Sequence, residues 1–322
     1  MRRKIRSLIV FIFALLLCTV FTWSIEPGGY NLSASGIAYG SESLADSSGT
    51  LTKSKLSSYR QGQKLDVHFL SVGHGDCILL TCGDESMMID FGMEIYAAQI
   101  LDYLHRAGIK KLKYAVCTHP DPDHIGGMPQ ILTKFEPEHV LIPDVRKRSA
   151  YYKQVLSIIE ERECQVEHPI PGTILTLGDA VLTVYYPNPD IQSRKMNDYS
   201  IVLRLIHGRN SFLFTGDLLS TGERNLLVSG FPLRAKVLKV GHHGANTSSS
   251  KAFLKRVKPS YAVISCGPSP YNHPGKKALK RLRKTGAKMY RTDRQGTIVC
   301  SSNGIRLKWT PSRRYMEKII KK

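Results

Sequence analysis

The chain has 322 residues, of which 42% are hydrophobic, 22% are charged and 8% are aromatic. This composition suits one large globular domain or two small ones, and it excludes a wholly disordered chain, a collagen and a coiled coil. An excess of 46 Lys and Arg over 26 Asp and Glu gives a formal net charge of +20. Such a charge favours anionic partners without indicating a fold.

The positive charge is concentrated in the last third of the sequence. Residues 231–322 contain 23 Lys and Arg but only two acids, Asp293 and Glu317, whereas the first 230 residues are close to neutral. This distribution predicts a basic surface that faces a polyanion or an anionic cell envelope. A merely solubilising face is the alternative.

The N-terminus has the pattern of a targeting segment. Positively charged Met1–Arg6 precedes an uncharged, mostly apolar run, Ser7–Ile25. Residues 1–25 are therefore expected to be a signal peptide or a membrane anchor, with the body of the protein outside the cytoplasm, either secreted or anchored. Residues 26–62 are rich in Ser, Gly and Ala and are predicted to form a flexible linker.

Residues 63–310 alternate short strand-like runs with helical patterns. Turn residues and period-two alternation predict strands near 64–71, 77–81, 86–90, 114–118, 173–177, 180–186, 200–206, 211–215, 235–240, 262–265, 288–291, 297–300 and 304–309. Helical spacing predicts helices over 97–107, 149–162, 220–229 and 275–285. This order indicates a layered α/β protein, followed by a basic tail, 311–322. The Cys residues after Cys18 form no CxxC pair, so a thiolate zinc site is not expected and several are predicted to be buried thiols.

Four side chains that can bind metals follow one apolar strand within six residues. They are His119, Asp121, Asp123 and His124. Ligands at alternate positions of a tight loop can converge on one ion, while the adjacent His124 can point to a second. Imidazole with carboxylate suits Zn, Mn or Fe, and two such ions can orient and activate a water.

Two later strands end in residues of the same kinds. Asp217 follows the apolar run Phe212–Phe214, and His242 and His243 follow the run that ends at Val240. Because the loop after residue 118 already offers a set of metal ligands, both segments are expected to supply further ligands to the same site.

This set resembles the signature of the metallo-β-lactamase-fold hydrolases, and within them the branch typified by the C-terminal domain of ComEC, the DNA-uptake channel of competent bacteria. The motifs that carry the resemblance are Phe69–Asp76, Met88–Gly92, Thr118–Gly127, Asn197–Leu203, Phe212–Asp217, Leu238–Gly244, Asn272–Pro274 and Thr292–Ile298. They occur in the family's order over about residues 64–309. The resemblance implies a four-layer αβ/βα sandwich that stands alone, without ComEC's membrane channel.

The resemblance also implies two divalent metal ions, Zn or Mn, and no nucleotide cofactor. His119 and Asp121 would bind one ion, Asp123 and His124 the other, and Asp217 would bridge them. Asp121 stands where the wider superfamily has His. Asp198 lies where the superfamily has the His of its third motif, and it is expected to complete the first metal site. One of His242 and His243 should bind the second ion, and the sequence leaves open which.

Further roles follow from the same motifs. His273 resembles a late His that contacts the scissile phosphate or protonates the leaving group, with a structural His as the alternative. Asp90 and Asp76 would support the ligands from behind. His74 stands where relatives often have Gln. In the implied mechanism, Asp123 and Asp217 help to hold the attacking hydroxide.

The expected substrate is a polyanion, most concretely DNA or RNA cleaved by a phosphodiesterase. Immediately after His273, cations recur at helical spacing beside the expected active site. The predicted substrate-binding residues are Lys276, Lys277, Lys280, Arg281 and Lys284. A cell-wall phosphodiester, such as choline phosphate on teichoic acid, is the alternative substrate, and a non-catalytic surface binding module is the alternative class. Amide hydrolysis is disfavoured, since Asp121 breaks the HxHxDH pattern.

Overall fold

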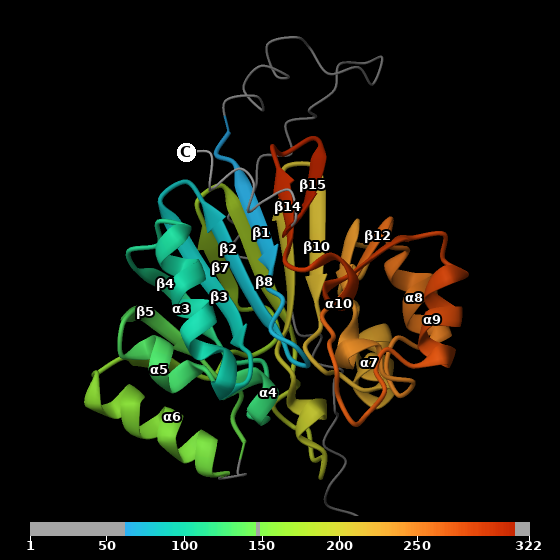
Figure 1. The fold of residues 1–322 in the computed structure, drawn as a ribbon. Helices are drawn as coiled ribbons and strands as arrows, with labels where there is room; N and C mark the ends of the chain where they lie inside the picture. Colours follow the sequence, from blue (N-terminus) through green and yellow to red (C-terminus); the bar gives the residue numbers. More distant parts are fainter. Residues whose placement is uncertain (1–61, 146–148, 313–322) are drawn as a thin grey trace, which may run out of the picture. The chain divides into compact units, whose positions relative to one another are not determined.

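The computed structural model describes residues 62–145 and 149–312 (Figure 1). The predicted signal or anchor, 1–25, lies outside the described residues, as do the linker 26–62 except Gly62 and the tail 311–322 except Pro311 and Ser312. In the part described, no helix has the length and hydropathy needed to cross a bilayer.

Within the described residues, the strands form an eight-stranded and a seven-stranded sheet. The first has the order β15 (Leu307–Pro311), β14 (Ile298–Ser302), β1 (Leu65–Phe69), β2 (Cys77–Cys82), β3 (Glu85–Phe91), β4 (Leu112–Val116), β5 (Pro137–Leu141), β6 (Gln165–Glu167). The second has the order β13 (Lys288–Arg291), β12 (Tyr261–Ile264), β11 (Val237–Lys239), β10 (Asn210–Phe214), β9 (Val202–His207), β8 (Ala180–Tyr186), β7 (Ile174–Leu177).

Helices cover the outer face of each sheet (Figure 1). Associated with the first sheet are η1 (Glu94–Tyr96), α3 (Ala97–Arg106), α4 (Pro122–Ile125), α5 (Met128–Leu132) and α6 (Ala150–Glu161). Associated with the second are η2 (Met196–Tyr199), α7 (Ser220–Val228), η3 (Gly241–Gly244), α8 (Lys251–Val257), α9 (Lys276–Arg283) and α10 (Thr292–Gln295). The predicted four-layer α/β sandwich is therefore confirmed.

Three apolar clusters hold the layers together, and the period of two along each strand assigns side chains to them. In β2, Ile78 and Leu80 join the core between the sheets, whereas Leu79 joins the core beneath the helices of the first sheet. In the central core, the rings of Phe212 and Phe214 are almost parallel at 6.2 Å. Truncating either ring to Ala would cost about 3–5 kcal/mol.

Some strands and helices of the structure were not predicted from the sequence. β5, β6 and α8 were not predicted. β6 has only three residues, Gln165–Glu167, and none of them is fully buried, so it shows no apolar alternation. α8 has only seven residues and is set by its N-cap, where Ser250 accepts a hydrogen bond from the Phe253 amide at 3.3 Å. The described Cys residues are free and mostly buried, as expected.

The parallel strands bring the sequence motifs to one edge. β3, β4, β5 and β6 run parallel, as do β10, β11, β12 and β13. Their carboxyl ends point to the same edge within each sheet, and a backbone hydrogen bond joins the two edges, since the Ile201 amide before β9 donates to the Thr118 carbonyl after β4 at 2.9 Å. Within the second sheet, the His242 amide donates to the Gly216 carbonyl at 3.1 Å.

Candidate metal centre

The loop after β4 folds into a single helical turn that concentrates its polar side chains. α4 begins at Pro122, and the His124 amide donates to the Asp121 carbonyl at 2.9 Å. His119 and His124 are fully buried, with ring centroids 4.1 Å apart. The Nε2 atom of His119 lies 3.6 Å from Asp121 Oδ2. Close approach is possible because Gly75 lies beneath the loop, where a Cβ would come within 2.5 Å of the Asp123 carbonyl oxygen.

The second sheet adds a carboxylate and an imidazole. Asp217 Oδ1 lies 3.4 Å from His124 Nε2. His243 Nε2 lies 3.3 Å from Asp217 Oδ2 and 3.2 Å from Asp123 Oδ2. Ligand atoms of Asp123, His124, Asp217 and His243 all fall within 4.8 Å of one another.

The cluster has the properties of a divalent metal site. The Nε2 atoms of His119, His124 and His243 and the Oδ1 atom of Asp217 are buried without a hydrogen-bond partner. Buried polar atoms are normally paired, so four convergent unpaired ones require an explanation. A divalent cation bound by imidazole nitrogens and carboxylate oxygens would satisfy them all, and these ligands suit Zn or Mn.

Asp90 supports the two histidines of the β4 loop from behind. Its carboxylate accepts hydrogen bonds at 2.7 Å from the Thr118 amide, the Thr118 hydroxyl and His124 Nδ1. Thr118 Oγ1 is also 3.1 Å from His119 Nδ1. If each Nδ1 carries the proton, each Nε2 lone pair is directed into the cluster, which is the usual arrangement behind metal-binding histidines.

Asp76 and Lys239 form a buried ion pair beneath His243. The Lys239 ammonium lies 2.6 Å from Asp76 Oδ2, and both side chains are almost fully buried. Asp76 Oδ1 lies 3.5 Å from His243 Nδ1, while its amide donates to the Asp123 carbonyl at 3.2 Å. The pair therefore contacts both the imidazole and the backbone of the cluster. Sequence reasoning missed Lys239, although a lysine at the end of an apolar strand was a usable signal.

His243 is the better placed of the adjacent histidines. It is fully buried, and its Nδ1 donates to the Ser265 carbonyl at 3.1 Å, which leaves Nε2 facing the carboxylates. The side chain of His242 is 23% exposed, and its Nε2 lies 3.7 Å from Asp217. Both residues have left-handed backbone angles, φ 51° and φ 50°. Strained angles of this kind cost about 1–3 kcal/mol each and concentrate at functional sites.

Asp198 does not join the cluster. Its two oxygens accept hydrogen bonds from Ser193 Oγ at 2.9 Å and Thr221 Oγ1 at 2.6 Å. The neighbouring Asn197 faces the site instead, with Nδ2 3.4 Å from Asp217 Oδ2. The expectation that Asp198 completes the first site is corrected, because η2 turns its side chain toward α7 and directs Asn197 inward.

The carboxylates and imidazoles of the cluster shift one another's pKa values. Burial would lower the pKa of His243, but Asp217 and Asp123 outweigh it and raise that pKa to about 10. The pKa of His124 is raised well above its usual value against the effect of burial, by Asp217, Asp90 and Asp123. Burial would raise the pKa of Asp217, but the imidazoles hold it well below its usual range. Binding of a cation must therefore displace protons.

Three aromatic rings lie beside the cluster. His74 Nε2 is 3.5 Å from Asp123 Oδ2, and its ring lies 4.3 Å from that of His243. Burial and His243 lower the pKa of His74 to about 4. The half-buried His273 has its ring 5.2 Å from that of His242. The exposed ring of Tyr271 contacts both His74 and His273 and was not singled out from sequence.

The predicted basic helix forms, with one correction. α9 follows His273 within three residues, and it packs through Ala278 and Leu282. The exposed cations of α9 and its C-cap are Lys276, Lys277, Lys280, Arg283 and Lys284. Arg281 differs, because its guanidinium donates to the Ser249, Asn246 and Ser248 carbonyls at 2.7, 3.0 and 2.6 Å. We therefore assign Arg281 to holding the loop before α8 rather than to the substrate surface.

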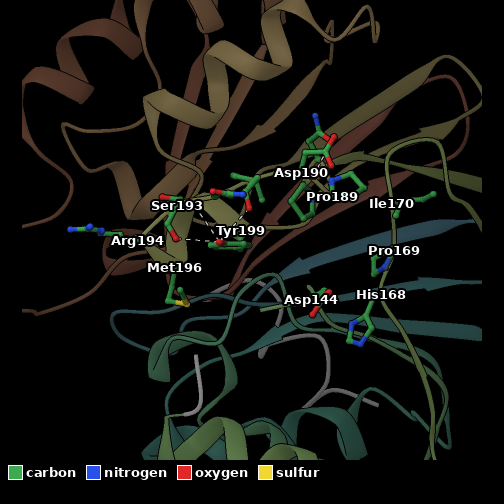
Figure 2. Close-up of a pocket in the computed structure, with 14 residues that line it drawn as sticks. Asp144, His168, Pro169, Ile170, Pro189, Asp190, Ser193, Arg194, Met196 and Tyr199 are labelled. Carbon is green, nitrogen blue, oxygen red and sulfur yellow. Dashed lines mark hydrogen bonds between the residues drawn. The ribbon is translucent and has the colours of Figure 1, made fainter. Parts of the chain in front are cut away.

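A cavity of about 910 Å³ lies beside η2, and no residue of the cluster lines it. Met196 and Tyr199 line one part of it and Asp144 and His168 another (Figure 2). Ser193 anchors the wall, since its amide donates to the Tyr199 hydroxyl at 3.3 Å and its hydroxyl donates to Asp198. Asp198 thus links the cavity wall at Ser193 to η2.

Comparison with known proteins identifies the family. Residues 70–182 and 195–267, more than half of the chain, match the Metallo-beta-lactamase superfamily. The protein belongs to this superfamily. The crystal structure of the metallo-beta-lactamase fold protein YhfI from Bacillus subtilis covers 74% of this chain and 100% of its own, with a TM-score of 0.52 and 13% identity. At that identity the likeness shows the fold alone.

This chain has homologues among competence proteins of the ComEC type, as the motifs predicted. It is 34% identical over 202 residues to ComE operon protein 3 of Bacillus subtilis, covering 62% of this chain and 26% of that protein. It is 32% identical over 230 residues to competence protein ComA of Neisseria gonorrhoeae, covering 70% of this chain and 30% of that protein. The chain thus spans about a quarter to a third of the length of these relatives.

Proposed function

We propose that this metallo-β-lactamase-superfamily domain is a phosphodiesterase that uses two divalent ions, Zn or Mn, to cleave nucleic acid. The observation that carries the proposal is the convergence of unpaired imidazole and carboxylate atoms, beside which His273 leads, three residues later, into a helix with exposed lysines. The first feature suits hydrolysis, and the second suits a substrate with repeating negative charge.

The ligands divide into two sets that share the carboxylates between them. His119 and Asp121 would hold one ion, and His124 and His243 the other, with Asp123 and Asp217 close to both. When bound, such ions polarise the phosphate and lower the pKa of a water. Asp90 and the Asp76–Lys239 pair keep the imidazoles oriented, so little reorganisation is needed during the reaction.

The chain's own groups would position the phosphate. His273 borders the cluster from the side where α9 begins, so its imidazole can donate a hydrogen bond to a phosphate oxygen or to the leaving group. The exposed lysines would attract the neighbouring phosphates, which makes binding salt-dependent and weakly sequence-specific.

The test uses the full-length chain, stripped of metal and then resupplied with Mn or Zn. We expect metal-dependent cleavage of DNA or RNA that weakens at moderate salt and is lost in Asp217→Asn. Asp102→Asn is the matched control, because this carboxylate is 58% exposed and pairs with Arg106 on α3. Metal binding without cleavage of any nucleic acid would contradict the proposal. Hydrolysis of a choline-phosphate ester instead would favour a cell-wall phosphodiester.

We further propose that the domain acts outside the cytoplasm. Support comes from residues 1–25, where a basic start precedes an apolar run. Protease added to intact cells or spheroplasts should digest the domain, and full protection until the membrane is disrupted would contradict this location.

A further inference from the structure

Tyr271 places an exposed aromatic ring at the edge of the metal centre. It is 67% exposed. Its ring centroid lies 5.5 Å from that of His74 and 5.9 Å from that of His273, at an interplanar angle of 28° to the latter. His74 and His273 in turn contact the cluster through Asp123 and His242. The three rings thus contact one another, from the buried His74 beside Asp123 to the exposed Tyr271.

The segment that carries Tyr271 is held in a definite conformation. Pro268, Pro270 and Pro274 restrict the backbone around it. The Tyr271 amide donates to Ser269 Oγ at 3.2 Å, and Asn272 has a left-handed φ of 52°. A ring presented on a restricted backbone loses little conformational entropy when a ligand covers it. Because so much of the ring is exposed, burial in the fold does not account for its presence.

We propose that Tyr271 is a stacking platform for an unpaired base next to the phosphate being cleaved, so that the substrate is single-stranded nucleic acid. The inference rests on the proposed phosphodiesterase function and narrows its substrate. Every base has a π-face, so such a platform binds without strong sequence preference. In a duplex both faces of a base are already stacked, and only an unpaired or flipped base can cover the ring.

The surrounding charge favours a base over a cationic headgroup. A tyrosine face can also bind a quaternary ammonium group by a cation–π interaction. Lys276 and Lys277, exposed at the start of α9, follow Tyr271 by five and six residues. Their charge repels a quaternary ammonium and attracts the phosphates on either side of a base.

Cleavage kinetics test the platform directly. The substrates are a single-stranded DNA oligonucleotide and the same sequence built from abasic residues. We expect Tyr271→Ala to raise KM for the normal oligonucleotide about 5- to 20-fold with little change in kcat, because stacking stabilises the bound substrate and the transition state alike. The abasic strand should show no such change. Tyr271→Phe should behave as wild type, as should Val228→Ala, which alters a side chain that is 84% exposed elsewhere. An unchanged KM in Tyr271→Ala would overturn the proposal.

A binding measurement separates this inference from the proposed function. The probe is single-stranded DNA containing 2-aminopurine, mixed with the metal-stripped full-length protein. Stacking quenches its fluorescence, and we expect Tyr271→Ala to abolish the quenching. If wild type cuts no nucleic acid but this loss is seen, the proposed function fails and the platform stands. Quenching that is unaffected by Tyr271→Ala, or a raised KM for p-nitrophenyl phosphorylcholine in that variant, would overturn the platform.

Discussion

The two halves of the His/Asp cluster are built to different degrees. In the inner half, comprising His124 and His243 with the shared carboxylates, each imidazole is fixed by a charged or carbonyl acceptor, Asp90 or Ser265. In the outer half, comprising His119 and Asp121, the imidazole is fixed by the hydroxyl of Thr118 at 3.1 Å, and the Asp121 side chain is 25% exposed. Ligands that are already oriented lose less entropy on binding, so the inner half should bind its cation more tightly.

Removing the carboxylate common to both halves should have the largest effect. Asp217→Asn keeps the side-chain shape but removes the charge that lies beside His124 and His243. We expect cleavage to fall by on the order of 10²–10³-fold, as when a group that stabilises the transition state is lost. Steady-state cleavage measured beside Asp102→Asn checks this. Activity retained within about tenfold would show that Asp217 is not shared in this way.

The two adjacent histidines, His242 and His243, should differ in how much each contributes to cation affinity. His243→Ala removes the imidazole that we propose as a ligand of the inner half. Loss of a residue that only supports a ligand lowers metal affinity by at most about 100-fold, so we expect the affinity for the more tightly bound cation to fall by at least that factor. His242→Ala should change it by less than about tenfold, since its side chain is partly exposed and more distant. Calorimetric titration of both variants with Mn²⁺ measures the difference. If His242→Ala weakened cation binding more than His243→Ala, His242 and not His243 would be the ligand.

The buried ion pair should affect stability and metal affinity separately. Lys239→Met leaves the Asp76 carboxylate buried without its cation, which typically costs about 3–5 kcal/mol. We expect Lys239→Met/Asp76→Leu to recover most of the unfolding free energy, because an apolar pair can replace a buried ion pair. Affinity for the cation should stay about 10- to 100-fold reduced, since His243 has lost its neighbour. Recovery of both properties in the double variant would show that the pair only fills space.

The smallest effect concerns the pH dependence of the metal-stripped protein. Asp217 and Asp123 raise the pKa of His243 to about 10, above the value of 6.5 expected when unfolded. This stabilisation is complete below pH 6.5 and is lost as pH rises toward 10. The melting temperature should therefore fall over that range. Saturation with Mn²⁺ should reduce the fall, whereas a melting temperature that rises with pH would contradict the ion pairs.

The fold was predictable because its signals are local. Short apolar runs between turn residues marked β2, β8 and β10, and helical spacing marked α3, α6 and α9. The motifs also predicted that His119 and Asp217, which follow β4 and β10, and His124, which lies in α4, come together. The side-chain directions that depend on contacts between elements were not predictable. The turn of η2 decides whether Asn197 or Asp198 faces the cluster. The hydrogen bonds of Arg281 to the loop before α8 give it a structural role.

Contacts across the chain account for the remaining omissions. Lys239 matters because β11 carries it against Asp76, more than 160 residues earlier in the sequence. His74 and Tyr271 lie almost 200 residues apart and meet only because the turn after β1 and the loop after β12 reach the same edge. No spacing rule within one segment reports such pairs.

The central claim, that the cluster holds two cations in unequal halves, is tested most directly by titrating the metal-stripped full-length protein with Mn²⁺ in a calorimeter. We expect two binding steps, the tighter one releasing protons and disappearing in His243→Ala. A single step, or two steps that survive in His243→Ala with unchanged affinities, would contradict the division of the cluster into an inner and an outer half.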